Sequence, residues 1–373
     1  MAHGATQANL PVLSIGKTVN LLTDTYCGAL REGLPFRELP SVMLWGPPGV
    51  GKSQAVRQIG SEIAGRTGRK VQITDVRLLL FNPIDLRGIP TANADKTLAV
   101  WLKPQIFQMD DSPEVVNMLF LDEISAAPQS VQAAAYQITL DRQVGEHRLP
   151  ENCIVLAAGN RVTDKSVAFK MPKALANRLL HIEIESGFES WKNWATQTGV
   201  NKMVLGYLSF AQNKLFGFDP DSDDLAFATP RSWEMVSHLL NHINEDPNAI
   251  APLIAGLVGS ATAFEFRSWC RIYSTLPDIK KIFAGEEQQV PQKTDELYAV
   301  ASSMLAYARE HSEDAEAVSN SLTYAAKLPA DFARMITQGY MIMRPGYRQV
   351  LEKMPEYQKL VRRKGEFSNG RTR

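Results

Sequence analysis

The residues whose types and spacing most clearly indicate a chemical role form a glycine-rich segment. It lies between a short apolar run and a segment with helical spacing. Its glycines let the backbone curve so that several N–H groups point at one anion, and a following helix N-terminus adds partial positive charge. Lys52 would contact the β- and γ-phosphates, and Ser53 would ligate Mg²⁺ through its hydroxyl. The predicted nucleotide contacts are Gly46, Pro47, Pro48, Gly49, Val50, Gly51, Lys52, Ser53 and Gln54.

A second apolar run, Met118 to Leu121, ends in the carboxylates Asp122 and Glu123. The reactive groups of a parallel sheet lie at the carboxyl ends of its strands, so these carboxylates should lie beside the phosphate loop. Asp122 could hold Mg²⁺ through its water shell, and Glu123 could polarise an attacking water. An isolated Asp-Glu pair is often only a solvated turn. Its position downstream of a phosphate loop favours hydrolysis.

Two further polar residues could complete such a site. The apolar run Ile154 to Ala158 delivers Asn160 to the end of another strand, where its amide could orient water or simply make a turn. Thr229 and Pro230 have the chemistry of a helix start, which places Arg231 in the first turn. A cation there opposes the helix dipole, so we expect an anionic partner for Arg231.

The elements that must position these residues are arranged in about two domains, which is the number that the length of the chain indicates at about 150 residues per domain. Apolar periodicity predicts a helix over 17–30, a strand over 71–75, a projecting insert over 78–101, a hairpin over 140–149, a helix over 172–180 and a strand over 181–185. Residues from Ser190 onward are almost wholly helical in pattern. We therefore expect a loose leader over 1–14, an α/β domain over 15–186, a helical lid over 187–285 and a helical extension over 286–373.

Composition restricts the setting. The 40 basic and 40 acidic residues balance, so overall charge gives no general attraction to nucleic acid or membrane. The three cysteines contain no CxxC pair, which is typical of buried free thiols in a reducing cytosol. The N-terminus lacks a signal-peptide pattern, and the longest uncharged run, 248–264, is interrupted by proline and glycine. We expect a cytoplasmic protein without a membrane span.

The set of motifs, in this order, resembles the AAA+ ATPases: GPPGVGKS (Walker A), LFLDE (Walker B), the Gly159-Asn160 strand end, Arg178 and Thr229-Pro230-Arg231. The insert sequence from Asp85 to Pro90 and the hairpin before Asn160 are similar to the MoxR group, with its CbbQ and NorQ branches. The resemblance covers about residues 15–285. It implies a P-loop NTPase parallel sheet, an all-helical lid and a helical C-terminal region.

The resemblance also implies roles and partners. Asn160 corresponds to sensor 1, Arg231 to the lid arginine called sensor 2, and Arg178 to an arginine finger that acts on the neighbouring subunit's γ-phosphate. Leu179 follows Arg178 where the family commonly has an aromatic residue, so Arg161 and Lys173 are rival candidates. A homo-oligomeric ring, most commonly a hexamer, with ATP and Mg²⁺ as cofactors, is implied by the family.

Three functions compete. The leading hypothesis is a ring ATPase that remodels or activates a protein client, or inserts a metal or cofactor into it, beside a partner with a von Willebrand factor A (VWA) domain. The second is a nucleic-acid motor related to MCM-type or restriction-associated rings, supported by Arg142, His147 and Arg148 and by a basic tail, but opposed by the balanced charge. The third is a nucleotide-gated binding module with slow hydrolysis. The tail cations are Arg362, Arg363, Lys364, Arg371 and Arg373.

Overall fold

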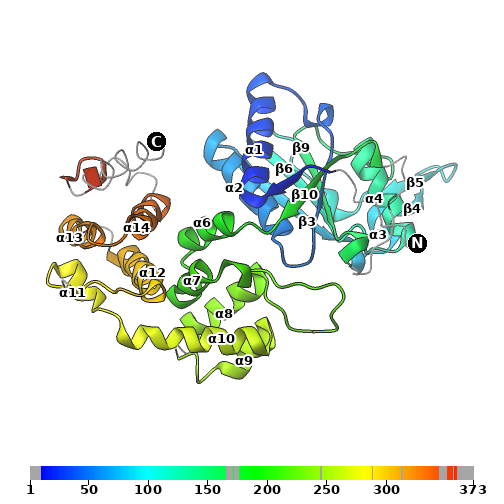
Figure 1. Ribbon diagram of the computed structural model, residues 1–373. Helices are drawn as coiled ribbons and strands as arrows, with labels where there is room; N and C mark the ends of the chain where they lie inside the picture. Colours follow the sequence, from blue (N-terminus) through cyan, green and yellow to red (C-terminus); the bar gives the residue numbers. More distant parts are fainter. Residues whose placement is uncertain are drawn as a thin grey trace, which may run out of the picture. The chain divides into compact units, whose positions relative to one another are not determined.

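The computed structural model describes residues 10–164, 171, 176–243, 246–287, 289–311, 314–343, 351–355 and 357–358. The chain divides into two compact units: Met1–Gly187 with Asp219–Ser222, and Phe188–Phe218 with Asp223–Arg373. Figure 1 colours their elements in chain order, from the blue α1 to the orange α14.

The first unit is built on a six-stranded sheet in the order β1-β10-β2-β9-β6-β3. All neighbouring strands in it are parallel. The strands are β1 (Val12–Ser14), β2 (Val42–Trp45), β3 (Lys70–Arg77), β6 (Val115–Asp122), β9 (Cys153–Gly159) and β10 (Leu180–Glu185). Because β9 lies between β2 and β6, the carboxyl ends of these three strands meet at one edge. This arrangement confirms the predicted parallel α/β core.

Helices cover both faces of this sheet, which explains why its central strands are apolar without alternation. The helices α1 (Ile15–Glu32) and α2 (Lys52–Thr67) pack on one face, where Phe120 of β6 contributes to the core. The helix α4 (Gln129–Asp141) packs on the other face, which receives Leu119. Helix α1 begins at the N-cap Ser14 and ends at Gly33 in the left-handed conformation.

The expected leader over 1–14 requires a correction. Residues 1–9 lie outside the part of the chain that the structure describes. Val12–Ser14, however, form the edge strand β1, in which Leu13 pairs with Ile184 of β10. The leader is therefore not loose over these residues, because parallel pairing with β10 gives their backbone groups partners.

Two small antiparallel elements project from the first unit. The insert contains η2 (Leu78–Leu80), α3 (Pro83–Arg87), the hairpin β4 (Ile89–Ala92) and β5 (Ala99–Leu102), and η3 (Gln105–Phe107). A second hairpin consists of β7 (Gln143–Val144) and β8 (His147–Arg148) and turns at Gly145, whose φ is 56°. The two elements touch, since His147 Nε2 lies 2.8 Å from Trp101 O. A Cβ on Gly145 would lie 2.5 Å from Arg87 O, so the contact requires glycine.

The second unit contains no strand among its described residues and has one apolar core. Its helices are α6 (Phe188–Thr198), α7 (Lys202–Phe210), α8 (Pro230–His242), α9 (Ala251–Val258), α10 (Ser260–Cys270), α11 (Ile279–Ala284), α12 (Thr294–His311), α13 (Ala315–Ala325) and α14 (Ala330–Met343). Trp233 of α8, Met304 of α12 and Ile336 of α14 share the core, which therefore extends across the expected boundary at residue 285. None of the described helices is long and apolar enough to cross a membrane.

Candidate nucleotide-binding site

The glycine-rich loop joins β2 to α2 in a conformation that only glycine adopts easily. Gly49 and Gly51 have φ of 76° and 107°, and Gly51 is the N-cap of α2. A Cβ on Gly46 would lie 2.8 Å from Ile184 O, and one on Gly51 would lie 2.7 Å from Ile15 Cδ1. The loop is therefore fixed by close packing and lies at a helix N-terminus, as an anion-binding loop requires.

Lys52 connects this loop to the end of β9. Its Nζ donates to Gly46 O at 2.7 Å, to Pro47 O at 3.0 Å and to Asn160 Oδ1 at 2.9 Å. The ammonium group thus lies over the loop, where phosphate oxygens would compete for the same N–H donors. The structure brings Lys52 and Asn160 into direct contact although they are far apart in the sequence.

Ser53 and Asp122 supply a pair of oxygen atoms suited to Mg²⁺. The Ser53 hydroxyl donates to Asp122 Oδ2 at 2.8 Å, and Asp122 Oδ1 accepts the Glu123 N–H at 2.9 Å. Mg²⁺ is usually bound through one or two carboxylates plus substrate phosphates. No cluster of three or more acidic, histidine or cysteine ligands occurs in the described part of the chain. The donor set therefore fits a metal ion shared with a triphosphate.

Glu123 follows Asp122 at a sharp bend. Its φ of 59° is unusual for a non-glycine residue, and the next residue, Ile124, donates its N–H to Ala158 O at 3.0 Å. The bend leaves the Glu123 side chain exposed, and its carboxylate makes no hydrogen bond or ion pair with any described residue. It is available to accept a proton from water.

Ser125 is a site residue that the motif analysis missed. Its hydroxyl accepts the Asn160 N–H at 3.0 Å and so holds the end of β9 against the segment after β6. A Cβ on Gly159 would lie 2.7 Å from Ser125 Oγ and 2.9 Å from Met43 Cε, so glycine is needed there. The only hint in the sequence was a serine shortly after the carboxylate pair. Its partner, Asn160, can be identified only when β9 is known to lie beside β6.

Known proteins are similar to the part of the chain that contains these residues. Residues 41–181 match the family described as "ATPase family associated with various cellular activities (AAA)". Chaperone MoxR1 from Mycobacterium tuberculosis is 28% identical over 153 residues, which are 40% of this chain and 37% of that protein. Over residues 41–181 the α/β unit of this chain therefore resembles a MoxR-type AAA+ ATPase domain. The chain spans well under half the length of this curated relative.

Solved structures have lower similarity to the whole chain. A RuvB variant from Thermotoga maritima is 15% identical, with a TM-score of 0.35, over 78% of this chain and 81% of that one. NtrX from Brucella abortus is 14% identical, with a TM-score of 0.35, over 86% of this chain and 67% of that one. We base no conclusion on likenesses of this size.

The three candidate finger residues of the AAA+ domain have different surroundings. Arg161 forms ion pairs with Asp164, at 2.8 Å, and with Glu183, and hydrogen bonding to Asp164 raises its pKa. It is thus held by carboxylates of its own domain. Lys173 lies outside the described residues. Arg178 is exposed and makes no hydrogen bond or ion pair with any residue that the structure describes.

The segment that leads into the β7–β8 hairpin does not present Arg142 outward, which corrects one argument for nucleic-acid binding. Arg142 ends α4 with φ of 53°, and its guanidinium donates to Cys153 O and Leu39 O, each at 3.0 Å. Burial lowers its pKa. The side chain therefore braces the domain interior and is not available to a phosphate backbone, and His147 is engaged by Trp101 O.

Arg231 lies at the start of α8 in the second unit. Thr229 caps this helix by accepting the Ser232 N–H at 3.0 Å, and Thr229 N–H donates to Ser232 Oγ at 2.7 Å. Arg231 is exposed and has no hydrogen bond or ion pair within the described ranges. The predicted helix start is present, and the contact between Arg231 and a nucleotide stays a prediction.

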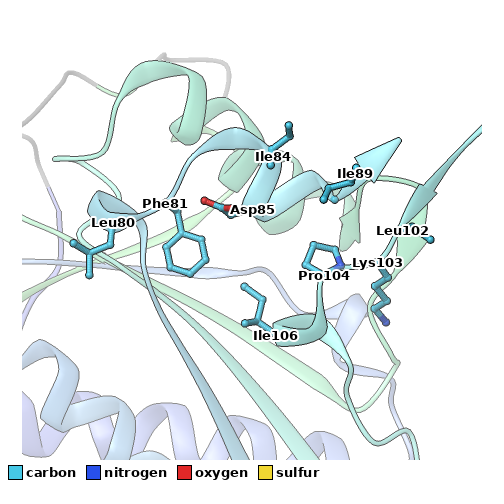
Figure 2. A pocket seen from close by; sticks show the side chains of 10 residues that line it. Leu80, Phe81, Ile84, Asp85, Ile89, Leu102, Lys103, Pro104 and Ile106 are labelled. Carbon is cyan, nitrogen blue, oxygen red and sulfur yellow. The ribbon is translucent and has the colours of Figure 1, made fainter. Parts of the chain in front are cut away.

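An apolar groove of about 410 Å³ lies in the insert (Figure 2), and no residue of the phosphate loop lines it. One side comes from η2 and α3, and the other comes from the end of β5 and η3. Ile84, Ile89 and Leu102 in its lining are 54%, 58% and 57% exposed. The lining is Leu80, Phe81, Ile84, Asp85, Gly88, Ile89, Leu102, Lys103, Pro104 and Ile106. Clustered, exposed apolar side chains of this kind are typical of an interaction surface.

Proposed function

We propose that this protein is a Mg²⁺-dependent ATPase that forms a ring and uses hydrolysis to remodel or activate a protein client, including by metal or cofactor insertion. The observation that carries the proposal is the convergence of Lys52, Ser53, Asp122 and Asn160 in two hydrogen-bonded pairs at one sheet edge. Beside them lies Glu123, whose carboxylate has no partner among the described residues. Each group is of the type that phosphoanhydride hydrolysis requires.

The hydrolytic step follows from these positions. Loop N–H groups and Lys52 bind the β- and γ-phosphates. Mg²⁺ held by Ser53 and Asp122 would neutralise more of the phosphate charge. Glu123 accepts a proton from water as its oxygen attacks the γ-phosphorus, while Asn160 orients that water. The bond from the γ-phosphorus to the bridging oxygen breaks, which leaves ADP and phosphate.

The proposal of a ring rests on Arg178. This cation is exposed and has no described partner, whereas its rival Arg161 is held by Asp164 and Glu183. An arginine finger contributes about 10³- to 10⁵-fold to turnover in related phosphoryl transfers. We therefore place Arg178 at a head-to-tail subunit contact, which closes into a ring when the rotation allows it. A hexamer, with Arg231 contacting the bound nucleotide, is the form that the family resemblance favours.

The client-directed part of the proposal rests on the insert. Its groove exposes apolar side chains, and such exposure does not stabilise a domain that has no partner. In addition, a relative that matches this chain is named a chaperone. We propose that the groove takes an apolar segment of the client, and that a VWA-domain protein is the partner that presents it. We place this activity in the cytoplasm, in keeping with the buried free thiols Cys27, Cys153 and Cys270.

A trapping experiment tests the function. Glu123→Gln keeps the shape of the side chain but removes the proton acceptor, so it should bind ATP and retain client while hydrolysis stops. The protein would be purified in ATP and Mg²⁺, and its bound proteins would be identified and compared with those retained by Lys52→Ala. ATP turnover equal to that of the wild type would show that Glu123 is not the base.

The other two hypotheses predict different results. A nucleic-acid motor should show DNA- or RNA-stimulated ATP turnover with steep salt dependence. A nucleotide-gated module should hydrolyse only one ATP per binding and release cycle of its client. With Arg142 turned inward, no described contact favours the motor over a protein-directed ATPase.

A further inference from the structure

His181 connects two functional segments of the AAA+ domain through its two ring nitrogens. Trp45 Nε1–H donates to His181 Nδ1 at 2.9 Å, and His181 Nε2 lies 2.7 Å from Ala176 O. An indole N–H can only donate and a carbonyl oxygen can only accept. Nδ1 is therefore the acceptor and Nε2–H the donor, so the two partners together select one neutral tautomer.

The first of these segments is the phosphate loop. Trp45 is the last residue of β2, directly before Gly46, and it pairs in register with Glu183 of β10. Gly46 itself packs on β10, since a Cβ there would lie 2.8 Å from Ile184 O. The beginning of the loop thus contacts β10 at two successive residues, so a shift of the loop would also displace this strand.

The second segment is the turn that carries Arg178. Ala176 O accepts both the His181 Nε2–H and the Leu179 N–H, the latter at 3.3 Å. Leu179 is buried while Arg178 is exposed. The turn is therefore fixed by a buried leucine and a doubly bonded carbonyl, and it presents the arginine outward from this anchored base.

We propose that His181 is a positioning residue that couples the phosphate loop of its own subunit to the arginine finger that the same subunit offers to its neighbour. The inference rests on the proposed ring ATPase and adds to it a route by which the occupancy of one site sets the position of the finger in the next. The route runs from Gly46 and Trp45 through the His181 ring to Ala176 and Arg178.

Two substitutions separate the two hydrogen bonds. In His181→Asn the amide oxygen can replace Nδ1 as acceptor for Trp45, but the shorter side chain does not reach Ala176 O. In His181→Gln the amide N–H₂ can take the place of Nε2 and keep the bond to Ala176 O. We expect His181→Asn to lower kcat at least tenfold with nucleotide Kd changed less than threefold, and His181→Gln to recover most of the kcat. Equal kcat values for the two variants would overturn the assignment.

The loop side of the coupling has its own test. Trp45→Phe keeps an aromatic ring but removes the N–H that bonds to His181. We expect it to keep kcat within threefold of the wild type and to lower the Hill coefficient for ATP toward one, because the finger then no longer follows the loop. An unchanged Hill coefficient would refute coupling through Trp45.

Mixed rings decide whether His181 acts on the neighbour. A Glu123→Gln subunit has an inactive site and an intact finger turn, and a His181→Asn subunit has the reverse. Mixing them should raise turnover at least threefold above the average of the two separate proteins, since intact sites then receive intact fingers. Turnover that stays at that average would show that His181 serves only its own site and would overturn the proposal.

A control mixture keeps this failure separate from failure of the proposed function. Arg178→Ala mixed with Glu123→Gln should show the same gain, because it tests the finger alone. Gain with Arg178→Ala but not with His181→Asn would refute the coupling and leave the ring ATPase standing. Gain with neither, or wild-type turnover that Lys52→Ala does not abolish, would refute both.

Discussion

The edge of the parallel sheet and the insert belong to the same unit but are built in opposite ways. At the sheet edge, Lys52 bonds to Asn160 and Ser53 bonds to Asp122, while the Asn160 N–H is held by Ser125. Glycines fill positions there in which a Cβ would be too close to its neighbours. In the insert, Ile84, Ile89 and Leu102 remain half exposed around a groove. The groups proposed to carry out the chemistry are thus fixed in position within the domain, whereas the insert leaves an open apolar surface of the kind that marks an interaction site.

The largest effect should come from Arg178, which makes no hydrogen bond or ion pair with any described residue of its own subunit. Arg178→Ala removes the finger and should lower ATP turnover by about 10³- to 10⁵-fold, the usual worth of such a cation. Nucleotide Kd should change less than threefold, because the phosphate loop is untouched. Steady-state turnover and binding of a fluorescent ATP analogue would be measured on the same preparation. If Arg161→Ala gave this result and Arg178→Ala did not, the finger assignment would be wrong.

Removal of the base should come next in size. Glu123→Gln should lower turnover by about 10²- to 10⁴-fold, as is typical for loss of general base catalysis. ATP binding should persist, since the Glu123 carboxylate makes no hydrogen bond or ion pair with any described residue. Single-turnover hydrolysis of prebound ATP would measure the chemical step directly. A normal single-turnover rate would contradict the role of Glu123.

Rigidity of the sheet edge is tested by adding one methyl group. Gly159→Ala places a Cβ against Ser125 Oγ and Met43 Cε and should cost about 1–3 kcal/mol of unfolding free energy through overpacking. It should also displace Asn160 and slow turnover. The matched control is Gly65→Ala in α2, where a Cβ meets nothing within 4 Å and helix propensity should add up to about 1 kcal/mol of stability. Chemical denaturation of both variants gives the comparison, and equal stabilities would count against the preorganised edge.

The smallest effect on chemistry should come from the insert. Ile89→Ser and Leu102→Ser should leave ATP turnover within twofold, because no residue of the phosphate loop lines the groove. Client retention by the Glu123→Gln protein should nevertheless fall at least tenfold when either change is added. Leu21→Ser, at an apolar residue of α1 that is 54% exposed and outside the groove, is the control and should retain client. Retention lost in all three variants would remove the special role of the groove.

The local motifs were sufficient to predict the parallel core and the grouping of its polar residues. A phosphate loop is specified by neighbours in sequence, and parallel strands bring Asp122 and Asn160 to the same edge whatever their order. The comparisons with known proteins also confirmed the predicted family resemblance, because that resemblance rests on the same local motifs.

Contacts between distant segments could not be predicted. Arg142 looked like an exposed hairpin cation, but its acceptors Phe36 and Leu39 precede it by more than a hundred residues. The bond between Trp45 and His181 joins residues 136 positions apart and depends on β10 lying beside β2. Strand β1 was missed because three residues have too little pattern to indicate an edge strand. Such features follow from strand order, which periodicity does not fix.

The central claim is that each ATP site is completed by a neighbouring subunit. The most direct measurement is ATP turnover per subunit over a wide range of protein concentration, in excess ATP and Mg²⁺, with Lys52→Ala as the background. We predict that turnover per subunit rises steeply through the concentration at which sedimentation shows assembly, and that Arg178→Ala assembles without this rise. Turnover per subunit that is constant from the dissociated to the assembled protein would contradict the account.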